Sequence, residues 1–198
     1  MDLRQSLLLT LNTKKMRTKK FAYVLLAGAF ALSLFTSNVM AGDNGRFSIG
    51  ANLGLPTGDD ANVYSMSIGG SLRYELPVGD NLGITGTVGY NSYLLKSEFD
   101  GTGLSLSSIP ILLGAKYYFQ EQQNGFYGMV QLGVTSTTAK VDLGGVSVSA
   151  SSTDLTFGPA IGYHLANLDF GAAYDIISAS GSSSGIIDIR IAYVLGEK

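Results

Sequence analysis

The chain has 198 residues, of which 26 are glycine, none is cysteine and only 14% are charged. Without cysteine it has no disulfide framework and no thiolate metal site. A charged share well below the usual quarter indicates that much of its surface does not face water. Residues 1–41 hold six of the 13 Lys and Arg and one of the 15 acids, so the remainder has seven basic against 14 acidic side chains. That acidic balance argues against a nucleic-acid partner.

The N-terminal segment has the layout of a secretory signal peptide. A basic stretch after Met16 precedes an uncharged apolar stretch at 21–35, and Val39-Met40-Ala41 places small or modest residues at the −3 and −1 positions. The apolar stretch is shorter than the roughly 20 residues of a membrane-spanning helix, so a retained anchor is the weaker alternative. We expect a signal peptide at 1–41, with 1–15 a long n-region or a mis-assigned start, and one domain at 42–198.

From residue 42 onward, apolar residues alternate with small or polar ones, and no helical stripe interrupts the pattern. The alternating stretches have about 9–13 residues, the length at which a tilted strand crosses a bilayer. In chain order, we expect strands at 46–55, 64–76, 82–92, 107–119, 126–136, 154–165, 168–176 and 186–195.

The two faces of these strands differ. One parity is apolar and, within the eight strands, uncharged. The other is mostly Gly, Ser, Thr, Ala and Asn with few charges, which suits the inside of a narrow barrel, while the apolar face would contact lipid, where a mid-bilayer Arg or Lys costs about 2–4 kcal/mol. The inward parity carries Gln131 and the residues of an expected interior polar network: Arg46, Arg73, Glu75, Lys116, Asp154, His164, Asp169, Asp175, Asp188 and Arg190. Eight strands leave an interior just filled by side chains, so this network is expected to plug the barrel.

The connections alternate in length. Those at 77–81, 120–125 and 166–167 are short, and those at 56–63, 93–106, 136–152 and 177–185 are longer. Outer-membrane barrels have short periplasmic turns and long extracellular loops. The sequence therefore predicts an all-β protein, an eight-stranded antiparallel up-and-down transmembrane β-barrel preceded by a cleaved signal peptide, in the outer membrane of a Gram-negative bacterium.

Aromatic residues gather next to the short connections. The stretch 109–134 has a polar tip, QEQQNG, with three aromatic rings directly before it and two soon after it. Rings with a polar tip are favoured at headgroup depth, so we expect a periplasmic aromatic girdle, with Tyr118 and Tyr127 beside its members, and a thinner outer one at Tyr64, Tyr90, Phe157 and Tyr174. The main girdle is expected to consist of Phe47, Tyr74, Tyr117, Phe119, Phe126, Tyr163, Phe170 and Tyr193.

Turn dipeptides occur inside two long connections, at Asp100-Gly101 and Gly144-Gly145. They predict hairpins that lift the third to sixth strands above the membrane, with loose Gly/Ser loops as the alternative. The apolar parity changes at the rim in both, and we expect a bulge there. Pro110 and Pro159 fall inside strands, where a closed ladder tolerates proline poorly, so local bulges are expected at these positions too.

The segments IPILLGAKYYF (109–119), LDFGAAYDI (168–176) and GIIDIRIAYVL (185–195) carry a family resemblance. The chain resembles the small eight-stranded outer-membrane barrels of the OmpX and opacity-protein type, the outer membrane protein β-barrel domain group. The resemblance implies an outer-membrane location and roles such as adhesion, host interaction or membrane integrity. Many members end on an aromatic that the barrel-assembly machinery recognises. Here Ile191, Tyr193 and Leu195 alternate before Gly196-Glu197-Lys198, which matches that feature only approximately.

The chain offers little for catalysis. His164 is its one histidine and lies beside a short turn, whereas outer-membrane hydrolases and acyltransferases place theirs at the extracellular rim. Asp59, Asp60, Glu98 and Asp100 in the outer loops could hold calcium or divalent-bridged lipopolysaccharide, but solvated acids are the simpler interpretation, and we expect no enzyme activity, no metal and no cofactor.

We expect a non-enzymatic integral outer-membrane protein whose partners are outer-membrane lipid, the barrel-assembly machinery and an extracellular ligand or host surface met by loops 93–106 and 136–152. The alternative is a secreted soluble eight-stranded barrel that binds a hydrophobic ligand, with the apolar face turned inward. Little surface charge and the absence of Trp and Cys disfavour it.

Overall fold

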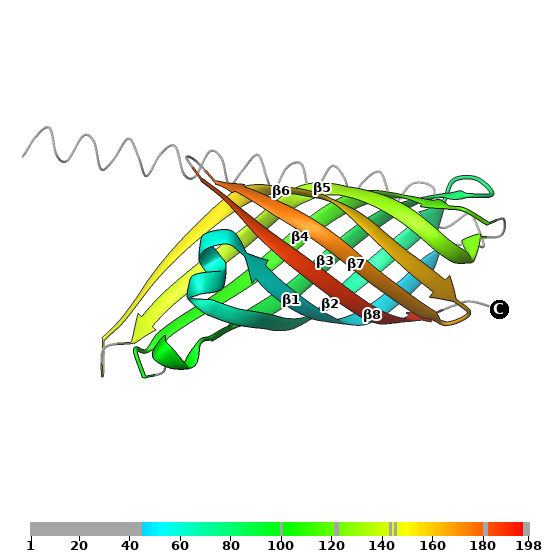
Figure 1. Cartoon of the computed structure of the whole chain (residues 1–198). Coiled ribbons are helices and arrows are strands. Elements are labelled where there is room, and N and C mark those ends of the chain that lie inside the picture. The colour runs from blue at the N-terminus through cyan, green and yellow to red at the C-terminus, as the bar shows by residue number, and fades with distance from the viewer. Residues whose placement is uncertain are drawn as a thin grey trace, which may run out of the picture. The chain divides into compact units, whose positions relative to one another are not determined.

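The computed structural model describes residues 45–99, 101–120, 123–142, 144, 146–179 and 182–195. Over these residues, eight antiparallel strands close into a barrel in sequence order, which confirms the predicted fold (Figure 1). The predicted signal peptide lies outside the described residues. The elements of the barrel are β1 Arg46–Thr57, η1 Gly58–Asn62, β2 Tyr64–Pro77, β3 Leu82–Leu95, η2 Ser97–Phe99, β4 Leu104–Tyr118, β5 Gly125–Asp142, β6 Ser147–Leu165, β7 Leu168–Ala179 and β8 Ser182–Leu195.

The alternation of side chains explains which face of each strand looks outward. Apolar residues such as Ile49, Leu72 and Ile161 are exposed on the barrel exterior, whereas Lys116 and Arg190 are buried in the interior. A buried aliphatic side chain contributes about 1.5–3 kcal/mol, so an exterior of this kind requires an apolar solvent around it. This orientation is the reverse of what the soluble carrier requires.

Pro110 and Pro159 interrupt ladders of the barrel without shifting their register. β3 and β4 pair at Val88–Ile111 and again at Asn91–Ser108, and Pro110 lies in the gap. β6 and β7 pair at Phe157–Ile176 and again at Ala160–Ala173, and Pro159 lies in the gap. The prediction of bulges at these prolines was wrong, because each proline lacks an N–H toward one neighbour only and keeps its place in the ladder with β5.

At one end of the barrel, here called the loop end, β5 and β6 extend far beyond their predicted bounds. Their ladder continues to Asp142–Ser147 in a single register, which confirms the hairpin predicted at Gly144-Gly145 and contradicts the bulge predicted at the rim. The neighbouring β4 pairs with β5 up to Leu104–Val141, also without a shift. Figure 1 shows these strands projecting at the loop end, in green and yellow.

The hairpin predicted around Asp100-Gly101 does not form. The ladder between β3 and β4 stops at Tyr93–Leu106, and η2 follows β3 in the connection; Asp100 itself lies outside the described residues. One register shift is found at this end, between β2 and β3 at Tyr64 and Met66, where no bulge was predicted.

At the opposite end, here called the turn end, two asparagines tie short turns to the next strand. The side-chain Nδ2 of Asn81 donates to the backbone carbonyl oxygen of Tyr118 (3.0 Å). The backbone carbonyl oxygen of Asn81 accepts a hydrogen bond from the Tyr118 N–H (2.8 Å). Asn167 makes the same pair of contacts with Val194. Because each asparagine continues a ladder beyond its hairpin, the turn end is closely held together.

Candidate functional site

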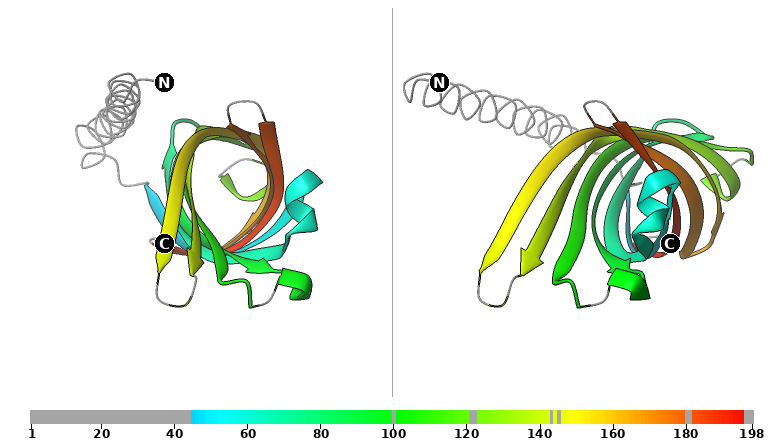
Figure 2. Two further views of the ribbon diagram at one scale, coloured as in Figure 1. Left: turned by 90° about the vertical axis from the view of Figure 1, so that its left-hand side faces the viewer. Right: turned by 60° about the vertical axis from the view of Figure 1, so that its left-hand side comes forward.

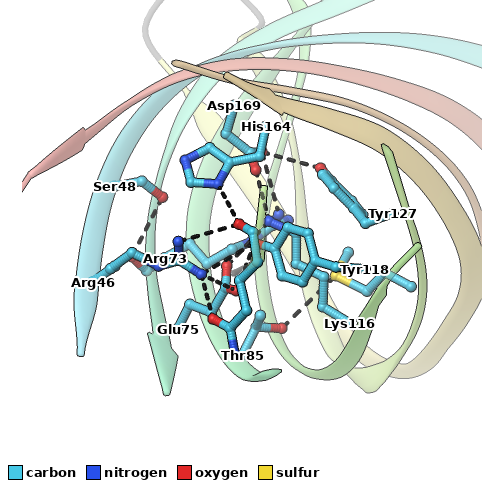
Figure 3. A network of polar contacts seen from close by, with 12 residues as sticks. Arg46, Ser48, Arg73, Glu75, Thr85, Lys116, Tyr118, Tyr127, His164 and Asp169 are labelled. Carbon is cyan, nitrogen blue, oxygen red and sulfur yellow. Dashed lines mark hydrogen bonds and ion pairs between the residues drawn. The ribbon is translucent and has the colours of Figure 1, made fainter. Parts of the chain in front are cut away.

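The most distinctive site is a group of buried charges in the turn-end half of the barrel interior, here called the inner cluster: Arg46, Arg73, Glu75, Lys116, Asp169 and Arg190. Its members come from β1, β2, β4, β7 and β8, and Figure 3 shows several of them converging on one layer. The strands bring them together because all belong to the inward parity.

Lys116 lies at the centre of the inner cluster and is 1% exposed. Its Nζ donates to Glu75 Oε2 at 3.0 Å and to Asp169 Oδ2 at 2.7 Å, and so joins carboxylates on opposite sides of the interior. The ammonium also lies 3.9 Å from the centroid of the Tyr127 ring and 4.9 Å from that of Tyr118. A desolvated cation between two carboxylates and two aromatic faces is well compensated.

Asp169 also contacts two arginines of the inner cluster, Arg190 and Arg73. Arg190 Nη1 lies 3.5 Å and Arg73 Nη1 4.0 Å from Asp169 Oδ1, which also accepts a hydrogen bond from Tyr127 Oη at 3.1 Å. The remaining donors of Arg190 are used as well, since Nε donates to Ser71 Oγ and Nη2 to Ser48 Oγ, both at 2.9 Å. Arginine therefore links β8 to β1 and β2 across the interior.

Gln123, in the connection between β4 and β5, lies at the turn-end mouth of the barrel and contacts the inner cluster. Gln123 has a φ of 52° and is 6% exposed. Its Oε1 accepts from Arg46 Nη2 at 2.6 Å, its Nε2 donates to the Gly79 carbonyl at 2.8 Å, and its own carbonyl lies 3.0 Å from His164 Nδ1. One glutamine thus joins β1, the β2–β3 turn and β6.

Two inward tyrosines complete this layer. Tyr118 and Tyr127 are 0% and 1% exposed, and their rings meet edge to face with centroids 5.6 Å apart. Tyr118 Oη donates to Glu75 Oε1 at 2.7 Å. A Cβ at Gly162 would collide with the Tyr127 ring, so glycine at that position makes the inward ring possible. The expectation that both tyrosines stand beside the girdle was wrong, because they occupy the inward parity.

The loop-end half of the interior is acidic and less densely filled. It holds a cavity of about 50 Å³, room for a few water molecules, which is lined by Asn52, Gln131, Asp175 and Asp188 and reaches Arg73 and Arg190 of the inner cluster. Asn52 Nδ2 donates to Asp188 Oδ2 at 2.7 Å, and Gln131 Nε2 donates to Asp175 Oδ1 at 2.5 Å. Asp154 lies half-buried on the same parity near the rim. Among the described residues, no ion pair reaches any of these three aspartates.

The rings assigned to the turn-end girdle lie on the exterior and contact each other in pairs. Phe47 and Tyr74 have centroids 4.6 Å apart, and Phe126 and Tyr163 4.7 Å apart. Tyr117 packs edge to face on Phe119 at 5.9 Å. The side chains of Phe170 and Tyr193 are also exposed on the exterior.

Sequence reasoning missed several members of the interior. The residue pattern marks Gln123 only as part of a polar tip, and Asn52, Ser48 and Ser71 only as small polar residues of the inward parity. The parity of β1 and β2 could have indicated the last three, whereas no periodicity extends into the turn that carries Gln123.

The geometry favours a structural network over catalysis. Every charge in the inner cluster is paired with an opposite charge, and its hydroxyl donors are tyrosines bonded to carboxylates. In the part of the chain that the structure describes, no group of three or more His, Asp or Glu side chains is arranged to hold a metal ion. Nor does any described helix have the length and apolarity to cross a membrane.

A closed barrel with an apolar exterior, an aromatic band and a charged, filled interior defines an integral membrane β-barrel. The chain belongs to the outer membrane protein beta-barrel domain family, whose model matches residues 27–190. It is therefore an integral β-barrel protein of the outer membrane. No match to this chain was found among curated proteins.

Two solved structures share the fold. Ail, the attachment invasion locus protein of Yersinia pestis, is 17% identical with a TM-score of 0.57, and the match covers 76% of this chain and 97% of Ail. The N-terminal β-barrel domain of Pseudomonas aeruginosa OprF is 16% identical with a TM-score of 0.53, covering 77% of this chain and all of that domain. A further structure of Ail contains the heparin analogue sucrose octasulfate.

Proposed function

We propose that this outer-membrane barrel is non-conducting and non-enzymatic, and that it serves as a platform for its loop end. One observation carries the proposal: Lys116, joined to Glu75 and Asp169 from opposite walls, fills the interior where the Gln123 turn closes the mouth. Eight strands leave little space beyond such a layer. By the usual arrangement of outer-membrane barrels, the turn end faces the periplasm and the loop end the exterior.

The plug has a direct electrical test. The mature protein in a planar bilayer is expected to show no stable, large openings, because the Lys116 layer and the Gln123 turn lie in series across the interior. An open porin inserted under the same conditions provides the positive control. Reproducible large openings that persist after repurification, and that change in size when Lys116 is replaced by Met, would contradict the plug.

The charges at the loop end indicate what kind of surface it offers. In the described residues, Lys96 and Lys140 stand against four acids, Asp59, Asp60, Glu98 and Asp142. The surface is therefore net acidic and does not favour a sulfated polysaccharide of the type seen bound to Ail. We propose instead that loops 93–106 and 136–152 contact a protein or the host surface.

Biogenesis follows from the same architecture. We infer that residues 1–41 are removed on secretion and that the barrel-assembly machinery recognises β8. Support for the second inference comes from Ile191, Tyr193 and Leu195, which alternate on the exterior face of that strand. The mature chain would then begin at Gly42.

A further inference from the structure

The interior cavity lies between the inner cluster and the loop end. It extends from Arg73 and Arg190 to Tyr93, which belongs to the last pair of the β3–β4 ladder at that end. Small inward residues leave this space open, among them Gly89 and Ala160. Figure 2 (left) views the barrel from the loop end, which is the side from which a ligand would enter, because the inner cluster fills the interior on the other side.

Arg73 brings unused hydrogen-bond donors to this cavity. Its Nε donates to Thr87 Oγ1 at 2.9 Å, and its Nη1 lies 4.0 Å from Asp169 Oδ1, beyond hydrogen-bonding distance. Among the residues that the structure describes, neither Nη1 nor Nη2 has a hydrogen-bond acceptor, although Arg73 is only 7% exposed. Because buried donors in proteins are almost always paired, their acceptors are water or a ligand in the cavity.

Asp175 and Asp188 bring unused acceptors to the same cavity. Asp188 lies opposite Ala173 on β7, two residues from Asp175, so the two carboxylates are diagonal neighbours on the inward face. Asp175 Oδ1 accepts from Gln131 and Asp188 Oδ2 from Asn52, whereas the second oxygen of each carboxylate has no donor in the described part of the chain. At a diagonal spacing of roughly 7–8 Å, one ammonium group can contact both carboxylates.

The charges of the interior balance only when both of its halves are counted. The inner cluster holds four cations against two carboxylates, and so has an excess of two positive charges. Asp175 and Asp188 add two negative charges on the cavity wall. A lone cation or a lone anion in the cavity would disturb this balance. A neutral molecule with separated charges preserves it and supplies an opposite charge to each side.

We propose that the cavity binds a small zwitterion of the glycine type. Its carboxylate would accept hydrogen bonds from the terminal nitrogens of Arg73, in the two-pronged manner typical of arginine, and its ammonium would donate to Asp175 and Asp188. The cavity volume of about 50 Å³ corresponds to roughly four water positions, which suits glycine and leaves no room for a large side chain. This inference goes beyond the proposed function, in which the interior serves only as a plug.

The test uses the folded, isotope-labelled mature protein in detergent micelles, titrated with glycine while the backbone amide chemical shifts are followed. We expect saturable shifts at residues that line the cavity, such as Gly89 and Gly171. Glycinamide lacks the carboxylate and acetate lacks the ammonium. We expect each to bind at least about tenfold more weakly than glycine, because each leaves one charged partner unpaired. Leucine has the charges of glycine but a large side chain, and should also bind at least about tenfold more weakly.

The variant Asp188→Asn removes one charge and keeps the shape of the side chain. Its matched control is Asp154→Asn, because Asp154 shares the inward parity but does not line the cavity. We expect Asp154→Asn to bind glycine as wild type does, and Asp188→Asn to bind it at least about tenfold more weakly. The affinity for acetate should not fall in Asp188→Asn, because acetate has no ammonium to contact the aspartates. Asp175→Asn repeats the test at the neighbouring carboxylate.

Equal affinity of wild type and Asp188→Asn for glycine, or glycine binding no tighter than that of glycinamide or acetate, would overturn the inference. So would a lack of saturation at glycine concentrations up to about 10 mM, or shifts confined to residues outside the cavity. Faster migration of each variant before boiling on a denaturing gel establishes that its barrel is folded. A non-conducting barrel that binds no glycine defeats this inference alone, whereas large openings with glycine binding intact defeat the proposed plug alone.

Discussion

At the scale of single residues, the stability of the interior depends most on Lys116. Replacing Lys116 by Met removes both of its buried ion pairs, while Glu75 keeps Arg46 and Asp169 keeps Arg190. Because no carboxylate loses its last cation, we expect the free energy of unfolding, measured by urea titration of the protein folded in lipid vesicles, to fall by about 1–3 kcal/mol, less than the about 3–5 kcal/mol of an orphaned buried charge.

Two further variants define this prediction. Lys140→Met changes the same residue type at an exposed site on β5 and should alter the free energy of unfolding by less than about 0.5 kcal/mol. Adding Glu75→Gln to Lys116→Met also takes away the carboxylate that pairs with Arg46 and should lower the free energy of unfolding further. A double variant as stable as the single one would show that the Arg46–Glu75 pair contributes nothing to stability.

Parity alone assigns the charged residues of the strands to the inner face, because no charge fits the lipid side. It does not tell which charges meet, since pairing depends on the register between strands and on side-chain reach. Lys116 donates hydrogen bonds to residues from two other strands, β2 and β7, a relation that no sequence spacing encodes. Tyr118 and Tyr127 were misplaced because adjacent aromatics were treated as one group although their parities differ.

At the scale of elements, the β6–β7 turn contains a residue in an unfavourable conformation. Ala166 has a φ of 47°, where an L-residue with a Cβ is disfavoured by about 1–2 kcal/mol and glycine is not. Ala166→Gly is expected to raise the free energy of unfolding by about 0.5–1 kcal/mol, after allowance for the greater entropy of glycine in the unfolded chain. Urea unfolding in vesicles measures it.

An alanine-to-glycine substitution within β7 itself should change the free energy of unfolding in the opposite direction. Ala172 is exposed in the middle of that strand and has no positive φ, so Ala172→Gly should lower the free energy of unfolding by about 0.5–1 kcal/mol. A loss of stability in both variants would show that the conformation of Ala166 carries no cost in this turn.

The existence and order of the strands could be predicted because the lipid and the interior impose a strict alternation. Their outer ends could not, since above the membrane that constraint disappears. β5 was expected to end at 136 and β6 to begin at 154, whereas they extend to Asp142 and from Ser147. The rim bulges were wrong for a related reason: the apolar parity changes there through the choice of residues, with the backbone register unchanged.

At the scale of the whole molecule, closure of the barrel predicts resistance to detergent. A sheet without open edges in its membrane-spanning part keeps its hydrogen bonds in detergent, so we expect detergent alone to leave this barrel folded until it is heated. We expect protein extracted from the outer membrane to migrate faster on a denaturing gel before boiling than after.

The same sample tests the mature boundary. Its intact mass should correspond to a chain beginning at Gly42, because the inferred signal peptide ends at Ala41. An unshifted gel band from a soluble fraction would oppose the membrane barrel, whereas a mass that includes 1–41 would oppose only the cleavage. Whole-cell lysate from cells without the protein serves as the blank.

The change of parity at the rim has a consequence for the membrane that this barrel suits. On β4 the exterior face is apolar from Tyr117 to Ile109 and polar beyond it, at Ser107 and Ser105. The eight steps from Ile109 to Tyr117, at about 3.4 Å each and tilted by roughly 40°, rise about 20 Å. The side chains at the two ends of this apolar band therefore fix its height, and that height matches a thin hydrocarbon layer. In a thicker bilayer, lipid would have to compress around it at a cost for every ångström of mismatch, so the barrel's own surface discriminates between membranes by thickness.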